Sequence, residues 1–241
     1  MAEIKRHTRQ FVLPVSKWDT VIREGDGIID DIFDRKGARF ADLVPEWIVY
    51  HVESTGPVEK CTRDTILDMV VQDQEYLMLE IYKCNNQTSM VNLRAACEHC
   101  YEPNGVSVDL DAIPFVEPPE SVKGENPVFK LTLPRSGWDC EWTYITGRQE
   151  LRAVEKMERG VYDPVAVLFE SIITLGPYRR DVDLKYRHVK ELLALDRATL
   201  RKSYNDNICG YNTRYRWRCS FCEKPNVTNL LGQPGFFRAM V

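Results

Sequence analysis

The chain has 241 residues, of which 44% are hydrophobic and 28% are charged, an ordinary globular composition with room for one large domain or two small ones. Its formal net charge is −4, whereas a protein that binds chiefly to a nucleic-acid backbone needs a basic footprint, so nucleic acid is not the expected partner. No stretch approaches the roughly 20 apolar residues that span a bilayer, and the polar start lacks the apolar run of a secretory signal. We therefore expect a protein that folds in cytoplasm and has no membrane partner.

The first 113 residues contain both strand and helix signals. A strand is predicted around Phe11 to Leu13, and a helix is predicted over PEWIVYHVEST, which begins at Pro45 and ends at Gly56-Pro57. A further segment, DQEYLMLEIY, begins at Asp73 and has a counterpart, DRATLRKSY, that begins at Asp196. The pair Cys97-Glu-His-Cys100 follows between two β-rich segments, which places it at the turn of a hairpin.

Residues 114–127 are predicted to form a linker. Pro118, Pro119 and Pro127 lie there among charged residues, and a proline cluster without periodicity continues neither a helix nor a strand.

Residues 128–241 contain a second series of elements. Strands are predicted at residues 128–133 and 140–145, and a helix at residues 149–159. A core helix should begin with Asp163 as its cap and Pro164 as its first residue, then run through VAVLFESIITL to Gly176-Pro177. Two further helices are predicted at residues 189–194 and 196–204, before Cys219-Ser-Phe-Cys222 at a second hairpin turn.

The two series are similar to each other in sequence. LPVSKWD at residues 13–19 returns as LPRSGWD at residues 133–139. The Gly-Pro pairs, the aspartates that open DQEYLMLEIY and DRATLRKSY, and the two Cys-x-x-Cys pairs recur in the same order at offsets of 120 to 123. We therefore predict an α+β fold of two pseudo-symmetric repeats, residues 1–113 and 128–241. Each repeat has β-hairpins and a few helices, and a four-cysteine site resembling a zinc ribbon joins them.

Cys97, Cys100, Cys219 and Cys222 are the predicted metal ligands. Two Cys-x-x-Cys knuckles can complete the tetrahedral sulfur shell that Zn²⁺ prefers, and four protein ligands leave no open position, so the zinc would be structural. The knuckles are 118 residues apart, far more than in most zinc ribbons, but related repeats that pack about a pseudo-twofold axis would bring them face to face. A redox Cys-x-x-Cys, two disulfides or metal-free thiols are the alternatives.

No catalytic residues are predicted. The sequence lacks nucleophile-elbow, phosphate-loop, zinc-protease and calcium-loop motifs, and its four histidines are scattered singly, so we expect neither enzymatic activity nor a small-molecule substrate. His99 should lie beside the metal site or be exposed. The remaining cysteines are expected to be buried or half-buried thiols: Cys61, Cys84, Cys140 and Cys209.

A basic run, Arg214-Tyr-Arg-Trp-Arg218, could stack bases and contact phosphates, which makes a zinc-ribbon regulator that binds nucleic acid the alternative function. On a strand, however, the alternation puts Arg214, Arg216 and Arg218 on one face and turns the aromatic side chains toward the core.

The order of motifs resembles that of the baseplate hub assembly proteins of contractile-tailed phages and related injection systems. The similarity covers roughly residues 70–240, including CEHC, LPRSGWDCEWTYITGRQEL and a closing series of helix, strand, knuckle, strand and Gly-x-x-x-Phe-Phe. The closing series comprises residues 192–204, 213–218, 219–222, 227–231 and 232–237. The resemblance implies a non-enzymatic structural component or assembly factor of the tail baseplate in the virion, assembled in the cytoplasm of a bacterial host. Its partners would be other hub proteins and the tape-measure protein.

Overall fold

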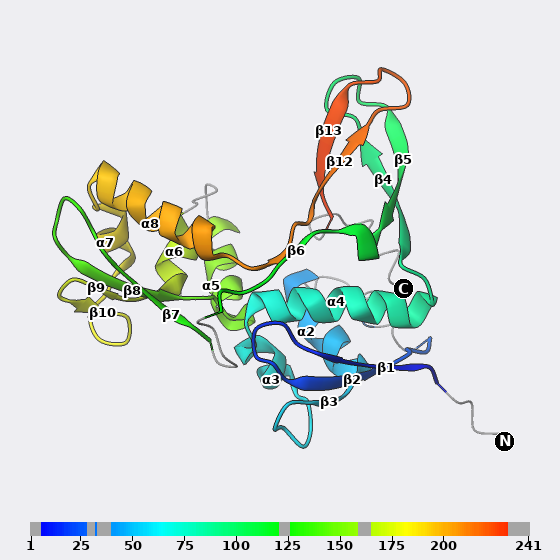
Figure 1. The fold of residues 1–241 in the computed structure, drawn as a ribbon, viewed down its shortest axis with the longest axis horizontal. Helices are drawn as coiled ribbons and strands as arrows, with labels where there is room; N and C mark the ends of the chain where they lie inside the picture. The colour runs from blue at the N-terminus through cyan, green and yellow to red at the C-terminus, as the bar shows by residue number, and fades with distance from the viewer. Residues whose placement is uncertain (1–5, 28–31, 33–39, 121–125, 159–164, 231–241) are drawn as a thin grey trace.

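The structure, a computed structural model, describes residues 6–27, 32, 40–120, 126–158 and 165–230. It is a mixed α and β fold with several small antiparallel sheets, which confirms the predicted α+β class (Figure 1). The buried apolar residues form two clusters, one drawn mainly from the first half of the chain and one mainly from the second half. None of the helices in these ranges is both long and apolar enough to cross a bilayer.

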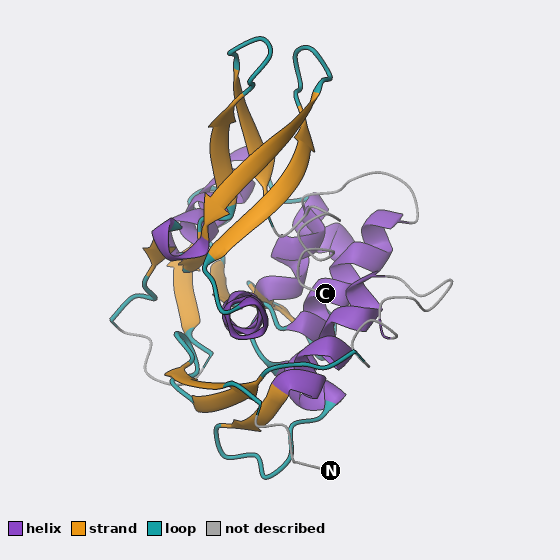
Figure 2. Cartoon of the chain, turned by 90° about the vertical axis from the view of Figure 1, so that its right-hand side faces the viewer, coloured by secondary structure: helices purple, strands orange, loops and turns teal. Residues whose placement is uncertain are grey.

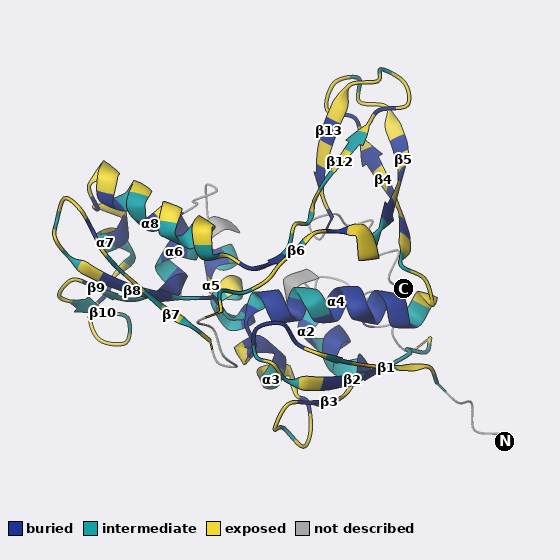
Figure 3. Ribbon diagram, viewed as in Figure 1, coloured by how far each residue is buried: buried dark blue, intermediate teal, exposed yellow. Residues whose placement is uncertain are grey.

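The first cluster is packed around helix α4, which crosses the middle of the molecule in Figure 1 and is buried along much of its length (Figure 3). A three-stranded sheet in the order β1-β2-β3 and two further helices surround it, and a hairpin of β4 and β5 follows. The elements of this half are β1 (Thr8–Val12), β2 (Asp19–Arg23), α2 (Phe40–His51), β3 (Val52–Thr55), α3 (Arg63–Asp68), α4 (Val71–Asn86), β4 (Met90–Ala96) and β5 (Pro103–Asp109).

The second cluster lies against a four-stranded sheet in the order β10-β9-β8-β7, with helices α5 to α8. Its elements are β7 (Val128–Thr132), β8 (Asp139–Thr143), α5 (Gly147–Glu158), α6 (Val165–Ser171), β9 (Ile172–Leu175), β10 (Tyr178–Arg179), α7 (Tyr186–Lys190) and α8 (Ala194–Asn207). The predicted cap at Asp163 and Pro164 lies outside the described residues.

The last hairpin packs on the first half of the chain. Within the segment predicted as a linker, β6 (Phe115–Val116) pairs with β11 (Gly210–Tyr211) beside α4, and this pairing carries the chain back across the molecule. The hairpin of β12 (Arg214–Arg218) and β13 (Pro225–Asn229) then projects from the body next to β4 and β5, with the turns of both hairpins at the tip (Figures 1 and 2). Leu230 belongs to the first apolar cluster, so the two hairpins form one arm on that core.

The two sheets share their pairing register. Thr8 faces Arg23 across β1 and β2, and Val128 faces Thr143 across β7 and β8, so each pair is the other shifted by 120 residues. The next strand of each sheet, β3 beside β2 and β9 beside β8, pairs with one register shift. The shift falls between Val21 and Ile22 in the first sheet and at the corresponding place, between Glu141 and Trp142, in the second. This agreement extends beyond the sequence landmarks, because it includes positions whose side chains differ.

A buried aspartate anchors the turn of each first hairpin to a helix. Asp73 of α4 accepts hydrogen bonds from the backbone N–H groups of residues 15 and 16, at 2.9 Å each. Asp196 of α8 accepts the same two bonds from residues 135 and 136, at 2.7 and 3.0 Å. The two carboxylates therefore satisfy equivalent N–H groups, which would otherwise be costly to bury.

Two predicted helix boundaries are wrong. VAVLFESIITL is helical only through Ser171, after which β9 pairs with β8 and β10; likewise PEWIVYHVEST is helical only through His51, and Val52–Thr55 is β3. In the second case Pro45 lies inside α2 rather than at its start. The β-branched run at 172–174 has a helix-compatible apolar pattern, but its backbone groups pair with neighbouring strands before the Gly-Pro turn.

The other predicted elements are close to those observed. The strands at residues 128–133 and 140–145, the helix at 149–159 and the hairpins around both knuckles are present with shifts of one to three residues. The helix predicted at residues 189–194 is wrong in extent, because α7 ends at Lys190 and α8 already begins at Ala194. The sequence pattern did not mark the break between these two helices, and α8 is held near its start by the bonds from Asp196 to the hairpin turn.

Candidate metal centre

The structure brings the four predicted ligand residues together at the tip of the arm. The sulfur atoms of Cys97, Cys100, Cys219 and Cys222 all lie within 4.8 Å of one another. The shortest separations cross between the hairpins: Cys97 Sγ lies 3.6 Å from Cys222 Sγ, and Cys100 Sγ lies 3.6 Å from Cys219 Sγ. Each hairpin therefore supplies half of one compact sulfur cluster.

These separations fit a metal better than disulfides. A disulfide needs an S–S distance near 2.05 Å, and all eight cysteines are free. Four sulfurs at about 2.3 Å from a tetrahedral Zn²⁺ would be separated from each other by roughly 3.8 Å, close to the two distances seen here. The donor set and its spacing therefore suit one tetrahedral ion of the zinc type.

Both knuckles have the same backbone geometry. The N–H of Cys97 donates to the carbonyl of Glu102 at 3.0 Å, and the N–H of Cys219 donates to that of Lys224 at 3.1 Å. Each turn closes through a non-glycine residue in the left-handed region, with φ of +63° at Tyr101 and +59° in the second knuckle. No helix among the described residues begins at either knuckle, so the helix dipole that activates a redox Cys-x-x-Cys is missing.

A pair of buried asparagines links each hairpin to the knuckle of the other. The Asn104 side chain donates to Cys219 Sγ at 3.5 Å and accepts from the N–H of Ser220 at 2.8 Å. Reciprocally, Asn226 donates to Cys97 Sγ at 3.5 Å and accepts from the N–H of Glu98 at 2.9 Å. The hairpins are thus interlocked by these reciprocal hydrogen bonds in addition to the sulfur cluster.

The asparagines were not predicted as part of the site. Their signal in the sequence is the shared pattern Cys-x-x-Cys-x-x-Pro-Asn, which ends in Pro103-Asn104 and Pro225-Asn226. Asparagine is not one of the usual zinc ligands, so ligand spacing does not identify a side chain that contacts the opposite knuckle. Both asparagines are buried, at 5% and 3% exposure, which separates them from the surface asparagines of the arm.

Hydrogen bonding favours thiolate at the first cysteine of each knuckle. Burial acts to raise the pKa of Cys97, but N–H donors from Cys100, His99 and Asn226 outweigh it and lower that pKa to about 6. Donors of the same kind lower the pKa of Cys219. At Cys100 the N–H of Glu102 acts to lower the pKa, but burial and the neighbouring sulfurs raise it to about 12. A cation among the sulfurs would displace such protons, since the thiolate is the ligand form.

We predict that Asn226→Asp weakens metal binding by about 10- to 100-fold, the usual cost of losing a group that supports a ligand. The new carboxylate cannot donate to Cys97 Sγ, and its charge repels the thiolates. Competition with a zinc-sensitive chromophore measures the affinity. Asn92→Asp on the exposed face of β4 is the matched control and should leave the affinity unchanged; an equal loss in both variants would mean that the Asn226 bond is irrelevant.

The other sequence candidates lie away from the sulfur cluster or at its edge. His99 is exposed, and its Nε2 lies 3.2 Å from the carbonyl of Pro225, so it is beside the site as expected. The remaining cysteines are buried, as predicted: Cys61, Cys84, Cys140 and Cys209. Burial raises the pKa of each of these four thiols, which keeps them protonated and unreactive.

The basic run lies on the outer face of the arm. Arg214, Arg216 and Arg218 alternate with half-buried Tyr215 and Trp217, which pack against the first apolar cluster. The predicted separation of cations from aromatic side chains is therefore confirmed. The aromatic rings are turned away from the arginine face, so that face offers charge but no stacking platform for bases.

No protein family model, curated protein or solved structure gave a match to the chain. The assignment of a metal centre therefore depends on the geometry of the four cysteines alone.

Proposed function

We propose that the four sulfurs hold one structural Zn²⁺. Four thiolates fill a tetrahedral shell and leave no position for water or substrate, so the ion would organise the arm rather than catalyse a reaction. The observation that supports this most strongly is the crossing of contacts: the shortest sulfur separations and the asparagine bonds to sulfur reach from one hairpin to the other. A metal at their centre would fix two distant parts of the chain as one rigid unit.

The matched halves support an origin by duplication. The strand registers, the aspartate anchors and the knuckle bonds all recur at offsets of 120 to 123 residues, including the buried asparagines. In this account residues 1–113 and 128–241 are diverged repeats of one module. Their last hairpins face each other about a pseudo-twofold axis that passes through the zinc.

The function is that of a non-enzymatic structural component or assembly factor of a phage tail baseplate hub. Two lines support it: the order of sequence motifs from residue 70 to residue 240, and a closed sulfur site at the tip of a projecting arm. The arm would present ordered surfaces to other hub proteins and to the tape-measure protein. The protein would act in the virion tail, after assembly in the bacterial cytoplasm.

Complementation of a phage that encodes the chain tests this role. A deletion mutant should produce particles with defective baseplates, and wild-type protein supplied from a plasmid should restore contractile tails seen by electron microscopy. Cys97→Ser with Cys219→Ser should fail to restore them, whereas Asn92→Asp should succeed. Normal baseplates in the deletion mutant would refute the proposed role and leave the zinc site standing as a separate result.

Nucleic-acid binding is the second candidate, and the exposed arginine face of β12 is the observation in its favour. Across β12 and β13 these arginines face Pro225, Val227 and Asn229, so no acidic residue of β13 opposes them. Retention on single-stranded DNA that falls steeply between low and physiological salt, and that is lost in an Arg214, Arg216 and Arg218 triple glutamine variant, would favour it. We expect no such retention, because the aromatic side chains face inward.

A further inference from the structure

One corner of the first half is covered by the second half. At the junction of α3 and α4 the N–H of Val71 donates to the carbonyl of Ile145 at 3.0 Å, and the N–H of Gly147 donates to the carbonyl of Met69 at 3.1 Å. Val70 and Thr146 form an antiparallel bridge between these bonds. The covering segment therefore leaves β8 in an extended form, pairs with the corner and then begins helix α5.

A charged contact continues this docking. Arg148, in the first turn of α5, forms ion pairs with Asp64 and Asp68 of α3, at 2.8 Å each. The covered corner thus combines two backbone hydrogen bonds, a buried apolar residue and a cation held by carboxylates.

The second half has the same corner at the junction of α7 and α8. Asp73 and Asp196 are the third residues of α4 and α8 and bind equivalent hairpin turns, so Val70 corresponds to Leu193, and Gln72 to Leu195. Val70 and Gln72 are only 6% and 5% exposed, whereas Leu193 and Leu195 are 55% and 53% exposed. No segment in the described part of the chain covers this second corner.

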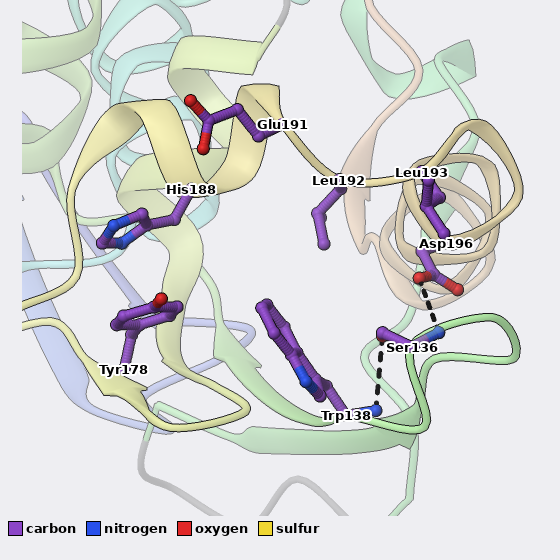
Figure 4. A pocket seen from close by; sticks show the side chains of 8 residues that line it. All are labelled: Ser136, Trp138, Tyr178, His188, Glu191, Leu192, Leu193 and Asp196. Atoms are coloured by element: carbon purple, nitrogen blue, oxygen red, sulfur yellow. Dashed lines mark hydrogen bonds between the residues drawn. The ribbon is translucent and has the colours of Figure 1, made fainter.

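A hollow of about 250 Å³ opens beside the exposed corner (Figure 4). The Tyr178 ring stacks on His188 with centroids 3.9 Å apart, and its edge meets Trp138 at 5.8 Å, so aromatic rings form much of the wall. Glu191 also lines the hollow and corresponds to Asp68, the partner of Arg148. Among the described residues the Glu191 carboxylate has no ion pair.

We propose that the α7–α8 corner is a docking site for a segment of a partner protein that leaves a strand and enters a helix, as residues 143–158 do at the first corner. The partner would place a carbonyl on the N–H of Ala194, an N–H on the carbonyl of Leu192, and an apolar side chain over Leu193. The inference rests on the proposed structural role, and it specifies where a neighbouring hub protein binds.

The hollow selects a basic side chain in that segment. The carboxylate of Glu191 attracts a cation, and the aromatic wall of the hollow stabilises one further. Asp64 is replaced by Arg187 at the second corner, so one carboxylate and the aromatic rings would take the place of two carboxylates. The same acidic and apolar lining disfavours a phosphate group, so the expected ligand is protein rather than nucleic acid.

A peptide with the sequence of residues 143–158, labelled with a fluorophore, is the probe for this site on the full-length protein. Anisotropy should show saturable binding with a dissociation constant of about 0.1 to 1 mM, since a short peptide loses much freedom on binding. Leu193→Asp should weaken binding at least about tenfold, the equivalent of exposing one buried leucine. Glu191→Lys should weaken it by about three- to fivefold, as expected for a partly exposed ion pair.

A charge swap makes the test specific. A peptide with Arg148→Glu should bind poorly to the wild-type protein and recover on the Glu191→Lys variant. Val227→Asp on the arm and Glu53→Lys on β3 are matched exposed controls and should bind the wild-type peptide normally.

Absence of saturable binding at about 2 mM peptide, or equal binding by the wild-type protein, the Leu193→Asp variant and the Glu191→Lys variant, would overturn the docking site. Zinc content is measured on the same variants and should stay at the wild-type level. Retained zinc and normal baseplates with no peptide binding would reject this site alone, whereas defective zinc binding in the wild-type protein would reject the proposed metal centre.

Discussion

Replacing Cys219 with serine should release the proposed zinc and loosen both hairpins of the arm, including β4 and β5, which carry no substitution. Loss of one of four ligands removes metal-binding free energy that also stabilises the fold. The substitution also removes the sulfur atom that the side chains of Asn104 and Cys100 contact. Hydrogen–deuterium exchange should show residues 90–109 losing about 100-fold in protection, and elemental analysis should show loss of the metal.

Cys61→Ser is the matched control for this substitution. Its thiol is also buried, at 5% exposure, but lies outside the sulfur cluster. The control should keep its zinc and the protection of both hairpins. If Cys219→Ser loosened β12 and β13 alone, the two hairpins would not be coupled through the metal, and the shared-site model would be incorrect.

Replacing Gly176 with alanine should destabilise the second half by about 2 to 5 kcal/mol. Gly176 has a φ of +55°, a conformation that costs an L-residue about 1 to 2 kcal/mol, and an added Cβ would lie 2.6 Å from the Trp138 ring. Relief of that overlap requires the indole to move, which typically costs about 1 to 3 kcal/mol more. Urea unfolding followed by far-UV circular dichroism measures the loss.

Gly137→Ala separates the two contributions to this loss. Gly137 also has a positive φ, of +69°, but nothing lies within 4 Å of an added Cβ. We expect this variant to lose only the conformational part, about 1 to 2 kcal/mol. Because Trp138 also lines the hollow at the α7–α8 corner, Gly176→Ala should weaken the 143–158 peptide while Gly137→Ala should not. Equal losses of stability in both variants would show that contact with Trp138 is not restrictive.

Local sequence signals were sufficient to predict the elements whose pattern is self-contained. The alternating strand at residues 128–133, the hairpins around both knuckles and the helix at residues 149–159 depend mainly on side-chain periodicity and turn residues. The four sulfurs could be grouped because two Cys-x-x-Cys pairs recur within similar flanks. This pairing across 118 residues depended on noticing the repeated order of motifs, since spacing alone does not join them.

Tertiary contacts determine the features that sequence patterns missed. Residues 172–175 end α6 early because β8 offers them strand pairing, and an apolar run does not reveal that competition. Asn104 and Asn226 act on the opposite hairpin, so no local pattern identifies their targets. The corner at Leu193 and Leu195 is exposed because no described segment packs on it, and a local pattern does not reveal that difference from the covered corner.

The two equivalent corners differ in whether another segment covers them. The first corner is occupied by residues 145–148 of the same chain, while no segment that the structure describes covers the second corner.

Native mass spectrometry of the purified protein, with elemental analysis of the same sample, most directly tests the shared metal centre. The account predicts one zinc ion per monomeric chain, and no zinc after serine replaces either Cys97 or Cys219. Two zinc ions per chain, one ion shared by two chains, or a chain that keeps full zinc after either substitution would contradict a single site built from both hairpins.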